Sequence, residues 1–138
     1  MLEEYKKGNQ YAKPNMTSYY TVMVACIHRT RGLTGIEKRR NFEILWKTFN
    51  ELHAPQVFVY QIIFSGIHRL LKGKEQQYFL RRVFKKCCSD GFVKESFFET
   101  FIKHATEESK LKVFNGCHYS KYEDIPKTWK IKCSNQLE

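Results

Sequence analysis

The sequence of 138 residues lacks any long apolar run, and this excludes the usual signature of a membrane-spanning helix. Such a helix needs about 18 or more consecutive apolar residues. The first residues, from Met1 to Lys7, also lack the apolar core of a secretory signal peptide, and Glu3 and Glu4 argue against a transit peptide. We therefore expect either a cytosolic protein or the end of a longer chain whose targeting segment is absent here.

The motifs of common catalytic and metal sites are also missing. Gly32 and Gly35 are too sparse to form a glycine-rich phosphate loop, and no His-x-x-x-His or Cys-x-x-Cys pair occurs. Cys87 and Cys88 are adjacent and cannot chelate as a zinc knuckle does. Cys117-His118 with Cys133 is the one combination that has metal-binding residue types, and it lies in a segment without regular pattern. We expect no enzyme, no metal and no cofactor.

Paired cysteines at disulfide-like spacing are absent as well. The five cysteines are an odd number without the spacing of a small secreted domain, which predicts reduced thiols in an intracellular protein. Basic residues, in contrast, are abundant: 24 Lys and Arg against 14 Asp and Glu give a net charge of +10. This charge favours an acidic partner, nucleic acid first and an anionic membrane second. A basic surface that serves solubility alone is the alternative.

The stretch from Leu52 to Gly91 predicts two antiparallel helices. Pro55 ends whatever precedes it, because proline cannot donate a backbone hydrogen bond. Apolar residues then recur at helical spacing in two runs separated by Gly73, and Gly91 provides a helix stop. The two stripes are Val59, Ile63, Ile67 and Leu70, then Leu80, Val83, Phe84 and Cys87. Neither helix can bury its stripe alone, so the pair needs similar neighbours.

The rest of the chain completes an all-α fold of about five or six helices. We expect further helices from Thr17 or Ser18 to about Arg29, and over about 37–52, 94–105 and 109–114. Residues 1–13 are predicted to be a polar basic segment, residues 14–114 helical repeats and residues 115–138 an extended, loosely structured tail. In that tail, Ile125 or Trp129 is expected to cover the last helices, as the end of a repeat array requires.

Related segments recur at intervals typical of helical-hairpin repeats. Pro14 corresponds to Pro55, and Tyr19 corresponds to Tyr60, which lies 41 residues further on. Phe97 follows Tyr60 after 37 residues. Intervals in this range favour stacked two-helix units, although ordinary amphipathic helices can show such a similarity by chance.

The two Pro-x-x-x-x-Tyr segments, 14–19 and 55–60, resemble the opening of the pentatricopeptide repeat. Residues 83–91 are similar to the second helix of that repeat, and residues 87–105 with 124–129 resemble the C-terminal ends of long algal pentatricopeptide proteins. The resemblance implies a right-handed solenoid that binds single-stranded RNA along the first helix of each repeat. It also implies a mitochondrial or plastid location, for which this chain shows no signal.

The resemblance further implies which side chains meet the bases. Base-reading pairs would be Tyr20 with Gln56 in the first repeat and Gln61 with Val93 in the second, while Thr17 and Phe58 would sandwich bases. Tyr20 and Val93 depart from the family's usual small polar residues, and Val93 has no hydrogen-bonding side chain. Phe58 can stack on a base for about 1–3 kcal/mol; the alternative is that Phe58 packs on the next repeat.

Two basic clusters are expected at the same rim of the stack, about one repeat apart. Their positions after the first helices suit contacts with phosphates, and their members are His28, Arg29 and Arg31, then Arg69, Lys72 and Lys74. A second set of basic residues lies on the second-type helices and contains Arg81, Arg82, Lys85 and Lys86. We expect this set to face outward, either as a solvated face or as a docking site.

Two functions remain open from the sequence. The first is non-catalytic binding of single-stranded RNA, in organellar RNA processing or within a ribonucleoprotein. The second is a protein–protein scaffold of the same architecture, whose aromatic groove would hold a partner helix or peptide. Positive charge along the first helices would favour RNA, and positive charge on the second helices alone would favour the scaffold.

Overall fold

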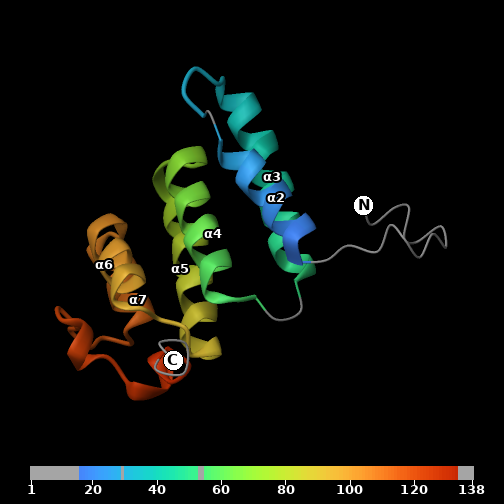
Figure 1. Cartoon of the computed structure of the whole chain (residues 1–138). Helices are drawn as coiled ribbons and strands as arrows, with labels where there is room; N and C mark the ends of the chain where they lie inside the picture. The colour runs from blue at the N-terminus through green and yellow to red at the C-terminus, as the bar shows by residue number, and fades with distance from the viewer. Residues whose placement is uncertain (1–15, 29, 53–54, 134–138) are drawn as a thin grey trace.

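The structure is a computed structural model that describes residues 16–28, 30–52 and 55–133, and most of these residues are helical (Figure 1). Its elements are α2 (Met16–Ile27), α3 (Gly35–Glu51), α4 (Val57–Leu70), α5 (Gly73–Asp90), α6 (Glu95–His104), α7 (Glu107–Val113) and the short 3₁₀ helices η2 (Tyr122–Asp124) and η3 (Lys127–Lys130). No strand occurs among these residues, so the predicted all-α fold is confirmed. Segment 1–13, Pro14 and Arg29 lie outside the described residues.

Local sequence explains where α3 begins and which face it buries. Thr34 Oγ1 accepts a hydrogen bond of 3.1 Å from the Glu37 N–H, and the Glu37 carboxylate accepts one of 3.1 Å from the Thr34 N–H. This reciprocal capping box satisfies two donors that the first turn leaves unpaired. Phe42, Leu45 and Phe49 then recur at helical spacing and are all buried. The helix therefore packs one apolar face inward.

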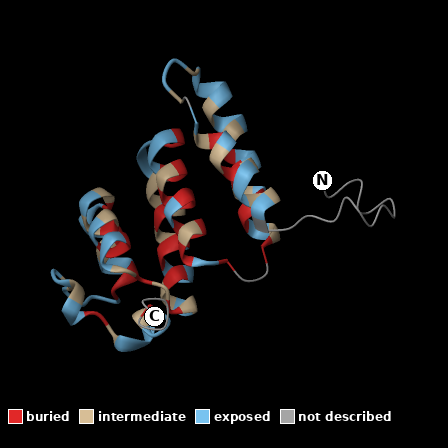
Figure 2. Ribbon diagram, viewed as in Figure 1, coloured by how far each residue is buried: buried red, intermediate tan, exposed pale blue. Residues whose placement is uncertain are grey.

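Helices α4 and α5 bury the stripes that the sequence predicted. All eight stripe residues, from Val59 to Cys87, are buried. Gly73 and Gly91 adopt positive φ angles of 62° and 77°, and Gly91 ends α5 in the left-handed conformation. Nine of the 14 residues of α4 are buried, so this helix forms the centre of the molecule, with exposed faces on the helices around it (Figure 2).

The helices are arranged as three successive hairpins. Helix α2 packs on α3, α4 packs on α2, α3 and α5, and α5 packs on α7. The turns within the three hairpins all lie at the same end of the molecule (Figure 1). The third hairpin is the shortest, because α7 has only 7 residues. The predicted contacts of α2 with α3 and of α4 with α5 are present, and α6 lacks an equally long partner, as expected.

The C-terminal segment is folded onto the second and third hairpins. The sequence predicted an extended tail, whereas the structure forms η2 and η3. The centroid of the Trp129 ring lies 6.1 Å from the ring centroid of Phe114 and 6.2 Å from that of Phe84. The side chain of Ile125 is buried. The expected covering role of Trp129 and Ile125 is confirmed. Apolar burial explains why this segment folds back rather than extending into water.

Candidate nucleic-acid interface

A groove with polar side chains on both walls and an apolar floor runs between α4 and α6. It encloses about 300 Å³ and is lined by Gln61, Ser65 and His68 of α4 and by Ser96, Thr100 and His104 of α6. Phe64 and Phe97 also line it, and their ring centroids are 5.7 Å apart. Both rings are buried, so the groove offers neutral hydrogen-bonding groups above an apolar floor, and these groups suit the edges of unpaired bases.

Helical spacing produces this groove. Gln61, Ser65 and His68 stand at i, i+4 and i+7 on α4, and the opposing residues of α6 show a similar spacing. Of the six polar residues, the sequence analysis singled out Gln61 alone. The signal that could have identified the others is a polar stripe on an otherwise apolar helix, read together with its counterpart on α6.

Two histidines close the groove in the last turns of α4 and α6. The ring centroids of His68 and His104 lie 4.1 Å apart. Burial is the main cause that lowers the pKa of His104 below its ordinary value, and the neighbouring charges of His68 and Lys103 lower it further. The surroundings of His104 therefore favour its neutral form.

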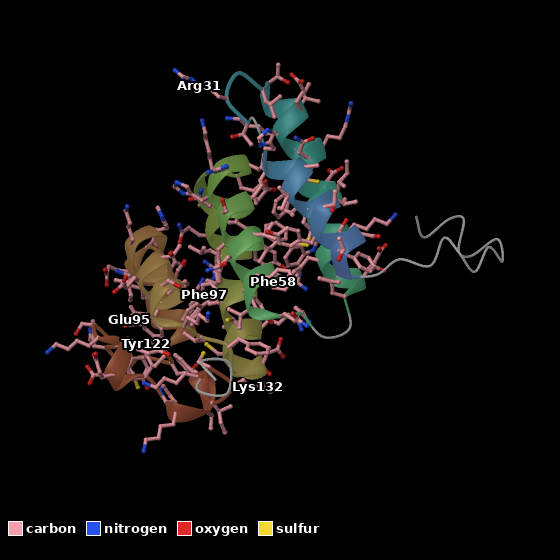
Figure 3. All side chains as sticks on the ribbon, in the orientation of Figure 1. Arg31, Phe58, Glu95, Phe97, Tyr122 and Lys132 are labelled. Carbon is pink, nitrogen blue, oxygen red and sulfur yellow. The ribbon has the colours of Figure 1, made fainter. Side chains whose placement is uncertain are left out.

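The basic residues predicted to contact phosphates lie where the hairpins turn. Arg31, Lys72 and Lys74 are exposed around the two turns, and Arg69 Nη1 lies 3.4 Å from the backbone oxygen of Ile27, to which it donates. That bond joins the end of α4 to the end of α2, so the two predicted clusters lie at one end of the hairpins. We name this set the hinge rim; its described members are His28, Arg31, Arg69, Lys72 and Lys74. Figure 3 shows Arg31 at the tip of the first turn.

Charge is distributed unevenly between the first and second helices. Helix α2 contains no charged residue, α4 contains Arg69 near its end, and α6 carries Glu95, Glu99 and Lys103. Helix α5, in contrast, contains five Lys or Arg residues and two acidic ones. Positive charge therefore gathers at the hinge rim and on α5 rather than along the first helices, so neither charge criterion is fully met: the rim favours RNA, and α5 favours the scaffold.

The predicted base-contacting residues of the first repeat lie at the junction of α2 and α4. Tyr20 is 40% exposed, and its ring meets that of Phe58 edge-on at a centroid distance of 5.1 Å. Phe58 is half-buried, so packing on the neighbouring repeat occupies part of its ring. Thr17 and Gln56 are exposed, and among the described hydrogen bonds none joins Gln56 to Tyr20.

Val93 cannot act as a base-reading residue, and this part of the prediction is wrong. Its side chain is fully buried, its N–H donates to the Trp129 carbonyl at 2.9 Å, and its carbonyl accepts from the Tyr122 hydroxyl at 2.8 Å. The folded tail covers the position that the repeat motif leaves open. Figure 3 shows Tyr122 and Lys132 of this tail at the end of the molecule remote from Arg31.

Of the four basic residues expected to face outward from α5, Arg82, Lys85 and Lys86 are exposed and Arg81 is half-buried. Arg82 lies over the Trp46 ring at 5.3 Å, and Lys86 pairs with Asp90 at 3.6 Å. Arg81, expected to face outward, instead donates from Nη1 to Ser109 Oγ at 2.9 Å. The outward prediction therefore fails for Arg81, because α7 packs against that side of α5.

Comparisons with protein-family models, with curated proteins and with solved structures found no match to this chain. Within residues 16–28, 30–52 and 55–133, no three His, Cys, Asp or Glu side chains converge to hold a metal ion. None of the helices in the same ranges is long and apolar enough to cross a membrane. What the candidate interface does must therefore be argued from its own geometry.

Proposed function

We propose that this protein is a non-catalytic helical-repeat protein that binds single-stranded RNA along α2, α4 and α6. The observation that carries the proposal is the junction between the neutral groove and the hinge rim, where His68 and Arg69 stand in one turn. Bases are recognised by hydrogen bonding and stacking, and phosphates by Arg and Lys. The groove supplies hydrogen-bonding side chains for the bases, and the rim supplies Arg and Lys for the phosphates.

The finer architecture belongs to the same proposal. Three hairpins in succession, with Tyr19, Tyr60 and Phe97 at equivalent places, support a right-handed pentatricopeptide-like solenoid. Two full repeats contact too few bases to select a site, so specificity would require further repeats in a longer chain or a ribonucleoprotein partner. Organellar RNA processing is the role that the resemblance implies.

Salt-dependent binding tests the proposal. A labelled mixed-sequence RNA oligonucleotide is titrated by fluorescence anisotropy from low to physiological salt. Lys72→Gln should reduce the log–log salt slope by about 0.7, the value for one lost phosphate contact on a single strand. Gln61→Ala should weaken binding with an unchanged slope, because the Gln61 side chain carries no charge.

Lys47→Gln is the matched control, since Lys47 is exposed on α3, away from the groove and the rim. If Lys47→Gln lowers the slope as much as Lys72→Gln does, binding is a nonspecific property of the basic surface. Absence of binding at low salt would contradict the RNA proposal altogether.

One observation favours the second function, a scaffold for a partner helix or peptide. The exposed Tyr20 and half-buried Phe58 form an aromatic surface beside α2, a helix without charged residues. An amphipathic partner helix could place its apolar residues on these rings. An RNA titration that shows no binding would make this scaffold the better proposal.

A further inference from the structure

A second pocket lies on the other row of helices, between α5 and α7. It encloses about 550 Å³, and its charged lining consists of Lys74 and Arg81 from α5 with Glu108 and Lys112 from α7. Lys74 also belongs to the hinge rim, but the other three residues have no part in the proposed RNA groove. The pocket therefore calls for an explanation of its own.

A partly buried hydrogen-bond network joins the two helices that form the wall of this pocket. Gln77 Nε2 donates to the His104 carbonyl at 2.9 Å, while Gln77 Oε1 accepts from the Thr106 N–H and from Ser109 Oγ, both at 2.9 Å. Ser109 is fully buried and accepts from Arg81. The network fixes α7 against α5 and sets the position of the Arg81 guanidinium.

Arg81 keeps most of its hydrogen-bonding capacity. A guanidinium has five N–H donors, and Ser109 Oγ is the one hydrogen-bond acceptor that the described residues offer to Arg81. Lys74 has no hydrogen bond or ion pair within the same described residues. Donors for a bound anion are thus present on the α5 side of the pocket.

The chain's own Glu108 shows where the cations converge. Its carboxylate lies 3.0 Å from Lys112 Nζ. The hydrogen bond from Lys112 is the main cause that lowers the pKa of Glu108, and the charges of Lys112, Arg81 and Lys74 also contribute. Three cations from two helices therefore favour negative charge in one place.

We propose that this pocket binds a phosphomonoester group. The pocket has a net charge of about +2, because its lining contains three cations, Lys74, Arg81 and Lys112, and one carboxylate, Glu108. This charge matches the near-dianionic charge of a phosphomonoester at pH 7. A phosphodiester carries a single charge and is matched less well. The volume of about 550 Å³ leaves room for a sugar or nucleoside attached to the phosphate.

Ribose 5-phosphate is the first probe, with binding measured by isothermal titration calorimetry on the full chain. Lys112→Gln should weaken binding roughly tenfold, the effect of one charge-assisted hydrogen bond. Lys110→Gln is the matched control: Lys110 is on the same helix but pairs with Glu107 at 3.1 Å and does not line the pocket. Glu108→Gln should tighten binding because it removes the competing carboxylate, and Glu107→Gln should change little.

A second arm identifies the source of the phosphate. An RNA oligonucleotide with a 5′-phosphate is compared with the same oligonucleotide ending in a 5′-hydroxyl group. Tighter binding of the phosphorylated form, lost in Lys112→Gln, assigns the pocket to an RNA end. Binding of ribose 5-phosphate without a difference between the oligonucleotides assigns it to a small phosphorylated molecule.

The proposal is overturned if neither ribose 5-phosphate nor the 5′-phosphate group binds. Equal effects of Lys112→Gln and Lys110→Gln on either ligand would also overturn it. These outcomes are independent of the RNA groove, which is tested through Gln61 and Lys72. Binding of ribose 5-phosphate requires no contact with those two residues.

Discussion

Single residues carry roles that their place in a motif does not reveal. Tyr60, the tyrosine of the second Pro-x-x-x-x-Tyr segment, is fully buried and donates its hydroxyl hydrogen bond to the carboxylate of Asp90. Burial, and then this bond to Asp90, raises the pKa of Tyr60 well above its usual range. The bond connects the first turn of α4 to the last turn of α5. This tyrosine therefore joins α4 to α5 at the end of the helix pair opposite the connecting turn.

Gly66 is a single-residue test of how closely the first two hairpins pack. A Cβ atom at Gly66 would overlap Leu45 Cδ2 and lie 2.9 Å from Ile27 Cγ2. Overpacking of this kind costs about 1–3 kcal/mol, whereas replacing a mid-helix glycine by alanine gains about 0.5–1 kcal/mol. We expect Gly66→Ala to lower the free energy of unfolding by about 1 kcal/mol net, as measured by urea denaturation.

Gly35→Ala is the control for that measurement. Gly35 opens α3, and a Cβ atom there meets no heavy atom within 4 Å. Its expected effect is neutral to slightly stabilising. If Gly66→Ala proves as stable as Gly35→Ala, the close approach of α4 to α2 and α3 is not as described.

At the scale of elements, helix boundaries followed from local signals. The helix expected over about 37–52 is observed as Gly35–Glu51, and the one expected over about 94–105 is observed as Glu95–His104. Caps, glycines and apolar periodicity act within one or two turns, so a sequence displays them directly. The polar groove depends on two helices meeting, and for that reason only Gln61 was identified beforehand.

The packing of α4 against α6 should depend on pH through the His68–His104 pair. Because the pKa of His104 is lowered in the folded chain, the unfolded chain takes up the proton first as pH falls. Stability from this site is therefore complete above about pH 6.5, the ordinary histidine value, and is lost as pH falls through the lower folded pKa. Urea denaturation at pH 7.5 and pH 5.5 measures the change.

His104→Gln should reduce the loss of stability between these two pH values. His118→Gln is the control, because His118 is an exposed histidine of the C-terminal segment. An equal acid-induced loss in the wild type and in His104→Gln would show that the histidine pair has no part in it.

At the scale of the whole molecule, the C-terminal segment covers apolar side chains of α5 and of the end of α7. Trp129 packs on Phe84 and Phe114 while its carbonyl accepts from the Val93 N–H. Trp129→Ala should therefore lower the free energy of unfolding by about 2–3 kcal/mol, somewhat less than for a fully buried tryptophan. Thr128→Ala, an exposed neighbour in η3, should stay within about 0.5 kcal/mol of the wild type.

Equal stability of Trp129→Ala and Thr128→Ala would contradict the covering role of the tail. The result bears on function, because the same segment buries Val93. A tail that did not pack would leave the backbone N–H and carbonyl of Val93 without their partners, Trp129 and Tyr122.

The sequence by itself determined the all-helical fold, the helix pairs and the buried stripes, because periodicity, capping residues and glycines act over a few residues. It also pointed to Gln61, which lines the groove, and to the basic residues that the structure places at the hinge rim. The tertiary structure decided the features that depend on contacts between segments far apart in the sequence. It buried Val93 under the tail, turned Arg81 toward Ser109 and brought Lys74, Arg81 and Lys112 around Glu108. Such contacts depend on how helices pack against one another, and no local pattern encodes that.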